Sequence, residues 1–171
     1  CSFVTLEASS SRYFPLPWET AFMVRGTIGY IFDYGGDEIP IFEKFFLGGL
    51  DSLRGFEERT VGPRVKRREY NRFITHPNQY DVVGGEKELF FNFEYLFPIV
   101  KSAGIRGVVF FDAGNAYRQN EGYLSDVRKS VGGGIRWQSP FGPLRVEWGL
   151  NLSPKDDENS SQFHFTMGTM F

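Results

Sequence analysis

The run Gly48-Gly49-Leu50-Asp51-Ser52-Leu53-Arg54-Gly55-Phe56 carries the most distinctive chemistry of this sequence. It lies inside a long polar insertion between two amphipathic segments and contains one arginine. A guanidinium binds carboxylates through a planar fork of donors, so Arg54 is a candidate for fastening this insertion to a wall of the protein. A solvated turn is the alternative interpretation of an Arg-Gly pair in a long loop.

Other residues that could do chemistry are few. The two histidines, His76 and His164, are far apart in sequence and lack convergent ligand partners, so the sequence predicts no metal site and no cofactor. No motif combines a nucleophile, a base and an orienting group, which argues against an enzyme and leaves no catalytic residues. The basic run at 64–68 could bind lipopolysaccharide phosphates, although such runs are more often solvated loop faces.

Composition restricts the class of protein. The chain has 171 residues, a net charge of −2 and 18% aromatic residues, so nothing points to a nucleic-acid partner. No apolar run approaches the roughly 20 residues that a membrane helix needs. High aromatic content with slightly negative mean hydropathy is typical of a transmembrane β-barrel, whose strands alternate apolar and polar side chains.

The alternation is visible along the chain. Near the C-terminus, Leu144, Val146 and Trp148 share one parity, while Arg145 and Glu147 share the other. The final segment puts apolar residues on one parity and small or polar ones on the other, with Phe163, Phe165, Met167 and Phe171 opposing Gln162, His164, Thr166 and Gly168. The pattern predicts seven strands, at about 2–14, 22–32, 88–97, 105–114, 130–137, 144–152 and 162–171.

The predicted connections alternate in length. Short ones rich in Pro or Gly lie at 15–19, 98–104 and 138–143, and long polar ones lie at 33–87, 115–129 and 153–161. This asymmetry is typical of outer-membrane barrels, which have short periplasmic turns and long extracellular loops. A soluble antiparallel sandwich or lipocalin-like barrel is the alternative, but its polar face should carry more Lys and Glu.

Seven strands cannot close a membrane barrel, because bacterial single-chain barrels use even strand numbers of eight or more. We therefore expect the chain to be part of a larger barrel, or to pair with another chain. Cys1 is interpreted as an introduced residue, a native strand residue or a lipidated first residue, and a single cysteine permits no internal disulfide.

Three motifs resemble the BamA family of outer-membrane β-barrel assembly factors. The run GGLDSLRGFEERTVGPR looks like the loop motif of that family, with Leu53 where Val or Ile is usual. Phe110-Phe111-Asp112-Ala113-Gly114 is similar to a strand motif of the family, and 132–154 with the terminal strand is similar to its C-terminus. The resemblance covers essentially the whole chain.

The resemblance implies a sixteen-stranded barrel preceded by periplasmic POTRA domains, with this chain as its C-terminal strands. Such proteins fold and insert unfolded β-barrel substrates into the bacterial outer membrane without ATP, alongside accessory assembly lipoproteins. It also implies a lateral seam at the terminal strand, which here carries Phe163, Phe165, Met167, Gly168 and Phe171.

In the family the loop arginine folds into the lumen and meets acidic wall residues, and the matching residues here are Glu94 and Asp112. Both lie on the inward parity. Gly55 would let the loop turn tightly, and Phe56 would pack on the inner wall. Alternatively, these acids pair with the other inward cations, Arg25, Arg106, Arg136 or Arg145.

A passive outer-membrane pore or a two-partner secretion translocator, which shares the Arg-Gly-Phe type of loop, is the alternative function. The tail of the motif, Thr60-Val61-Gly62-Pro63-Arg64, favours assembly.

Overall fold

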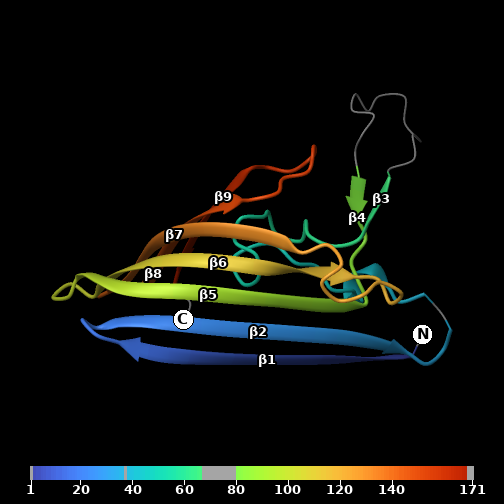
Figure 1. Cartoon of the computed structure of the whole chain (residues 1–171), viewed down its shortest axis with the longest axis horizontal. Coiled ribbons are helices and arrows are strands. Elements are labelled where there is room, and N and C mark those ends of the chain that lie inside the picture. The colour runs from blue at the N-terminus through green and yellow to red at the C-terminus, as the bar shows by residue number, and fades with distance from the viewer. Residues whose placement is uncertain (1, 37, 67–79, 169–171) are drawn as a thin grey trace.

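A computed structural model describes residues 2–36, 38–66 and 80–168 of the chain. Its main element is a curved seven-stranded antiparallel sheet whose strands follow chain order, β1-β2-β5-β6-β7-β8-β9 (Figure 1). The strands are β1 (Phe3–Leu16), β2 (Thr20–Asp33), β5 (Lys87–Val100), β6 (Ile105–Tyr117), β7 (Arg128–Ser139), β8 (Gly142–Asn151) and β9 (Ser161–Met167). The prediction of an all-β antiparallel fold with seven main strands is therefore confirmed.

Several strands run further than predicted and the short turns are shorter. Leu16 still pairs with Thr20, so the predicted turn at 15–19 spans only the residues between them. Ser139 pairs with Gly142, which leaves two turn residues where the sequence predicted six, at 138–143. A hydrogen-bonded ladder continues until the chain must reverse, and alternation of side chains does not mark that point.

The predicted loop at 33–87 contains structure that the sequence pattern missed. A short 3-10 helix, η1 (Ile41–Glu43), is followed by a two-stranded ladder of β3 (Arg64–Lys66) and β4 (Tyr80–Val82). This ladder lies at the end of the sheet to which β2 and β6 lead (Figure 1). Strands of three residues are too short to show an alternating pattern.

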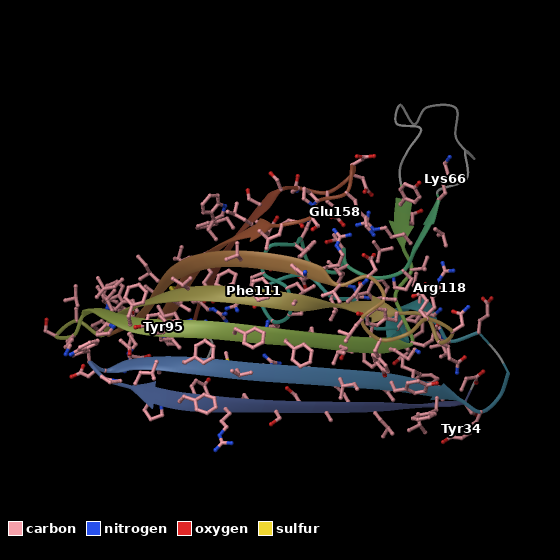
Figure 2. All side chains as sticks on the ribbon, viewed as in Figure 1. Tyr34, Lys66, Tyr95, Phe111, Arg118 and Glu158 are labelled. Atoms are coloured by element: carbon pink, nitrogen blue, oxygen red, sulfur yellow. The ribbon has the colours of Figure 1, made fainter. Side chains whose placement is uncertain are left out.

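Alternate residues of each strand face opposite sides of the sheet, as the sequence predicts. On β6, Val108 and Phe110 are 1% and 2% exposed, whereas Val109 and Phe111 are 49% and 36% exposed. Figure 2 shows Phe111 of β6 and Tyr95 of β5 on the same face of the sheet, the outer face. The outer face is therefore apolar and uncovered, and the polar parity forms the inner face. Among the residues that the structure describes, no helix is long and apolar enough to cross a membrane.

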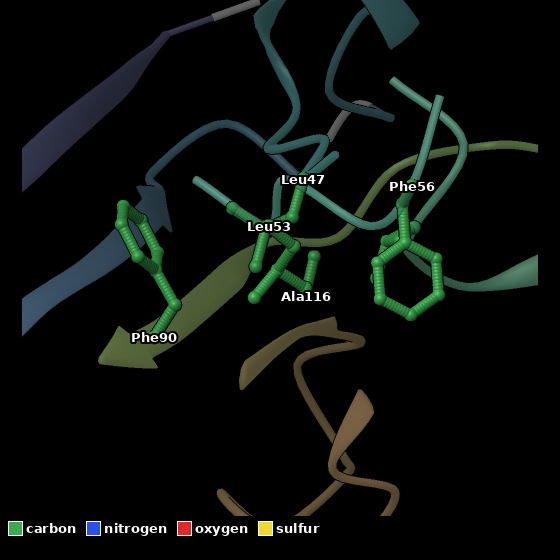
Figure 3. Packing of buried hydrophobic residues seen from close by; sticks show 6 residues of the cluster. Leu47, Leu53, Phe56, Phe90 and Ala116 are labelled. Carbon is green, nitrogen blue, oxygen red and sulfur yellow. The ribbon is translucent and has the colours of Figure 1, made fainter. Parts of the chain in front are cut away.

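The buried core lies between the inner face and the segment that precedes β3. Leu47, Leu53, Phe56 and Val61 of that segment pack with Phe90 of β5 and Ala116 of β6 (Figure 3). We call residues 45–62 the Arg54 loop. The sheet thus buries its inner face against its own loop, and this packing positions Arg54.

Candidate functional site

The Arg54 loop is a compact structure held at both ends. Leu47 and Val61 exchange backbone hydrogen bonds of 2.9 Å in each direction, which closes the base of the loop. Within it, the Gly49 N–H donates to the carbonyl oxygens of Leu53 and Phe56, at 3.2 and 3.1 Å. These bonds satisfy buried backbone groups and direct residue 54 at the sheet.

Two glycines allow the loop backbone to touch the inner face. A Cβ atom on Gly55 would lie 2.4 Å from the Ser130 Cβ and 2.7 Å from the Leu150 carbonyl oxygen. A Cβ atom on Gly149 of β8 would lie 2.5 Å from the Arg54 carbonyl oxygen. Gly55 has no positive φ angle, so close approach to β7 and β8, rather than a tight turn, explains the glycine at this position.

The Arg54 side chain binds Asp112 of β6 as a fork. Its Nε and Nη2 atoms donate to the two carboxylate oxygens of Asp112, at 2.8 and 2.6 Å, and the Arg54 backbone N–H donates to the same carboxylate at 3.1 Å. The guanidinium also stacks on the Phe110 ring, 3.8 Å from its centroid. Arg54 is 1% exposed and Asp112 is 0% exposed, so this pair is removed from solvent.

The remaining nitrogen of the fork, Nη1, donates to Glu94 of β5 and to Glu147 of β8, the latter at 3.3 Å. The structure therefore brings together Arg54, Glu94 and Asp112, the three residues that the family resemblance associated. Glu147 is a further partner that the sequence reasoning did not assign. The sequence indicated only that Glu147 faces inward, because it alternates with the outward-facing Trp148.

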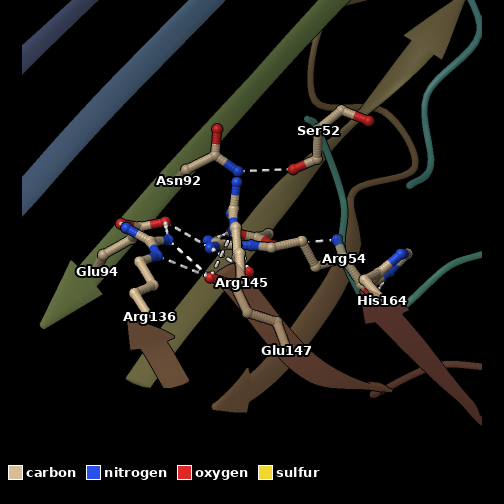
Figure 4. A network of polar contacts seen from close by, with 9 residues as sticks. Ser52, Arg54, Asn92, Glu94, Arg136, Arg145, Glu147 and His164 are labelled. Atoms are coloured by element: carbon tan, nitrogen blue, oxygen red, sulfur yellow. Dashed lines mark hydrogen bonds and ion pairs between the residues drawn. The ribbon is translucent and has the colours of Figure 1, made fainter. Parts of the chain in front are cut away.

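Two arginines of the wall complete the site (Figure 4). Arg136 of β7 donates to Glu94 at 2.8 and 2.9 Å and to Glu147 at 2.7 and 3.0 Å. Arg145 of β8 donates to both oxygens of Glu147, at 2.8 and 2.9 Å. We call the six residues Arg54, Glu94, Asp112, Arg136, Arg145 and Glu147 the Arg54 cluster; its three cations balance its three anions.

The alternative pairing of the two predicted acids is realised only in part. Arg136 shares Glu94 with Arg54, but among the described residues Asp112 has Arg54 as its only cationic partner. Arg25 instead donates to Ser9 and lies 5.9 Å above the Phe90 ring. The loop arginine is thus the main counter-charge of Asp112.

Neutral donors complete the environment of Asp112. The Asn92 side chain donates to Asp112 at 2.9 Å and to the Ser52 carbonyl oxygen at 2.6 Å, which ties β5 to the loop as well. Burial alone would lower the pKa of the Arg54 guanidinium, but the hydrogen bond and charge of Asp112, with Glu94 and Glu147, outweigh it and raise that pKa. Arg54 therefore stays cationic.

Phe56 and Arg64 make further contacts, with Arg128 of β7 and with the connection between β8 and β9. Phe56 is buried against the inner face, with the Arg128 guanidinium 5.1 Å from its ring centroid. Arg64 binds Asp157 at 2.7 Å and shares Glu158 with Arg128. In the basic run, Arg64 is therefore engaged by acids of the connection before β9, and residues 67 and 68 lie outside the described part.

The terminal strand lies at one edge of the sheet. Its outer parity is strongly exposed, with Phe163, Phe165 and Met167 at 61, 59 and 65%. Gly168 follows the strand, and its N–H donates to the Pro143 carbonyl oxygen at 2.9 Å. Phe171, like His76, lies outside the described residues.

His164 lies on the inner parity of β9. Its Nε2 atom is 2.8 Å from the Arg54 carbonyl oxygen. No group of three His, Cys, Asp or Glu residues in the described ranges could hold a metal ion. The site as a whole consists of ion pairs and hydrogen bonds, and what it can do is hold the loop on the wall.

The sequence is similar to a known protein family and to two characterised outer membrane proteins. The family model described as the Omp85 superfamily domain matches residues 1–171. The outer membrane protein assembly factor BamA of Nitratidesulfovibrio vulgaris is 35% identical over 147 residues, covering 84% of this chain and 17% of the relative. BamA of Neisseria meningitidis serogroup B is 31% identical over 188 residues, covering 93% of this chain and 23% of the relative.

A chloroplast protein and a solved structure are similar too. The chloroplastic outer envelope protein 80 of Arabidopsis thaliana is 30% identical over 135 residues, 74% of this chain and 15% of that protein. The crystal structure of BamA from Haemophilus ducreyi lacking POTRA domains 1–3 matches with a TM-score of 0.79 and 27% identity, over 95% of this chain and 34% of that chain. This chain thus spans 17% and 23% of the length of the two BamA relatives named above.

Proposed function

The chain belongs to the Omp85 superfamily, and on this premise we propose that it is the C-terminal part of a transmembrane barrel that folds and inserts β-barrel proteins into the bacterial outer membrane. It acts as a scaffold and not as an enzyme, and it uses no cofactor. The relatives named as outer membrane assembly factors support the activity and the location. The open, curved sheet with an apolar outer face supports a place in the wall of a larger barrel.

The observation that carries the proposal is the buried Arg54 cluster. It fixes a loop of the chain on the inner face, where its backbone touches β7, β8 and β9. A lumen filled by a pinned loop is poorly suited to a wide passive pore. A loop held against the last strands is well placed to set the position of the edge at which a new strand would pair.

The edge itself is the second part of the proposal. Among the described strands, β9 lies at an edge of the main sheet and pairs with β8 on its other side. Such an edge is a template for adding a strand. We infer that substrate strands pair there, at a lateral seam formed by Phe163, Phe165, Met167, Gly168 and Phe171.

The orientation follows from the lengths of the connections. The short turns lie on the periplasmic side, and the long connections between β2 and β5, β6 and β7, and β8 and β9 leave the sheet on the cell-surface side, as in other outer-membrane barrels. The Arg54 loop belongs to the first of these connections and folds back onto the inner face. The outer aromatic residues contact lipid. We expect accessory assembly lipoproteins to act with the full-length protein.

Insertion of a model β-barrel into liposomes by the full-length protein tests the proposal. Arg54→Ala is expected to reduce the insertion rate at least tenfold, because a lost buried ion pair costs several kcal/mol. Arg59→Ala is the matched control, since Arg59 lies in the same loop but contacts the Phe46 ring, 4.2 Å away, instead of an acid. Ion conductance is recorded in parallel.

Insertion by the wild type and by Arg59→Ala, with loss in Arg54→Ala, would support assembly. A wild-type protein that conducts ions but inserts no substrate would contradict it and favour the pore.

A further inference from the structure

We propose that His164 is a positioning residue that latches the terminal strand β9 to the Arg54 loop. The carrying observation is the 2.8 Å contact between the His164 Nε2 atom and the Arg54 carbonyl oxygen. Figure 4 shows His164, a residue of β9, next to Arg54. The consequence for assembly rests on the function proposed above, whereas the latch itself is a property of the fold.

The chemistry of the contact fixes the roles of its two groups. A carbonyl oxygen only accepts, so Nε2 of His164 carries the hydrogen and donates it. The acceptor is held in place, because the N–H and the guanidinium of the same Arg54 residue both bind Asp112. A donor on β9 therefore meets an acceptor whose position is set by the buried cluster.

The latch acts on the strand that is held least by the rest of the sheet. β9 is the shortest strand of the main sheet, with seven residues, and among the described strands it pairs with β8 alone, at the edge opposite β1. Within the described part of the chain, His164 provides the only side-chain hydrogen bond of β9. Its link to the loop is thus independent of the β8–β9 ladder.

The connection that leads into β9 is also held in place, through Glu158. Glu158, in the connection before β9, accepts from Arg64 and Arg128 and from the Asn151 side chain at 3.1 Å. Arg64 is separated from the Arg54 loop by Pro63 alone. β9 is therefore fixed before its first residue through Glu158 and at its middle through His164.

The direction of the contact determines which movements the latch opposes. His164 projects inward, whereas the backbone groups on the side of β9 that faces away from β8 lie in the plane of the sheet. A strand can therefore pair with that side of β9 with the latch intact. Any movement of β9 away from the loop must break it. The latch holds the pairing edge in a fixed place while leaving it open to a partner.

Hydrogen exchange of the β9 amides in the full-length protein, in lipid nanodiscs and without substrate, tests the latch. His164→Leu keeps a side chain of similar size but no donor, and is expected to raise exchange roughly threefold to tenfold, the effect of losing one hydrogen bond. His164→Gln, whose amide can donate to the same oxygen, is expected to stay within about twofold of the wild type. Should His164→Leu not fold, His164→Asn, whose amide is too short to reach, takes its place with the same expectation.

Gln162→Leu is the matched control, because Gln162 is the neighbouring inward residue of β9 and makes no side-chain hydrogen bond in the described structure. Unchanged exchange in His164→Leu, an equal rise in Gln162→Leu, or no rescue by His164→Gln would each overturn the latch. The readout needs no substrate. Failure of the wild type to insert a model barrel would therefore overturn the proposed function while leaving the latch standing.

Discussion

Replacing Arg54 by alanine is the perturbation whose effect can be worked out most fully from the structure. The substitution removes the fork that binds Asp112 and the single nitrogen that reaches Glu94 and Glu147. Glu94 and Glu147 keep Arg136, and Glu147 keeps Arg145. Asp112 keeps only neutral donors, so it bears most of the cost.

The size of the effect follows from that difference. A buried carboxylate that loses its cation destabilises a protein by about 3–5 kcal/mol. Asn92 and the backbone N–H of residue 54 offset a part of this, so we expect a value near the lower end of the range. At 1.36 kcal/mol per tenfold change, exchange of the loop amides should rise roughly 100-fold or more.

Hydrogen exchange over residues 45–62 in the full-length protein measures this directly. Adding Asp112→Asn to Arg54→Ala removes the unpaired charge and is expected to recover about 1–3 kcal/mol, so that the two substitutions are not additive. Arg59→Ala is expected to leave the loop amides near their wild-type rates. Loop exchange within threefold of the wild type in Arg54→Ala, or additive effects in the double variant, would refute the assignment of Asp112 as the main partner.

Three further outcomes follow from the site. Gly149→Ala should lower the free energy of unfolding by about 1–3 kcal/mol and release the loop, because the new Cβ would lie 2.5 Å from the Arg54 carbonyl oxygen. Gly26→Ala is the control, because its Cβ would lie 3.3 Å from the Phe91 ring, which can move, and urea denaturation measures both variants. The double variant Arg54→Glu/Glu94→Arg should insert substrate no better than Arg54→Ala. The new glutamate at position 54 would lie against Asp112 and Glu147, and the new arginine at position 94 would lie against Arg136. Recovery of insertion in liposomes would show that the Arg54–Glu94 pair acts alone. Glu158→Gln should speed proteolysis of the 153–160 connection, and Asp156→Asn, exposed and outside the ion pairs of the described structure, should not.

The alternation of the strands could be predicted because it is a local property. Val108 and Val109 differ in exposure although they are the same residue type, and parity alone separates them. The inward position of Glu94 and Asp112 follows in the same way. Their meeting with Arg54 was implied only by the resemblance to a family, since 40 and 58 residues separate them from it along the chain.

Other features depend on where the loop runs, which no local pattern describes. Glu147 was identified as inward but not as a partner of Arg54, because nothing in its own strand tells which part of the inner face the loop covers. The contact of His164 joins residues 110 apart. Gly55 was expected to serve a turn, and only the packed structure shows that the nearby Ser130 Cβ leaves no room for a side chain.

We infer that the Arg54 loop must be docked on the wall for the full-length protein to insert β-barrel substrates. Hydrogen exchange of the loop amides and the insertion rate, both measured on the full-length Arg54→Ala, Arg54→Lys, Glu147→Gln and Arg59→Ala variants, test this inference. We predict that the variants with faster exchange of the loop amides have lower insertion rates. Arg54→Ala should have the lowest insertion rate, and Arg59→Ala should equal the wild type. An Arg54→Ala protein whose loop is released but which inserts substrates at the wild-type rate would contradict the claim.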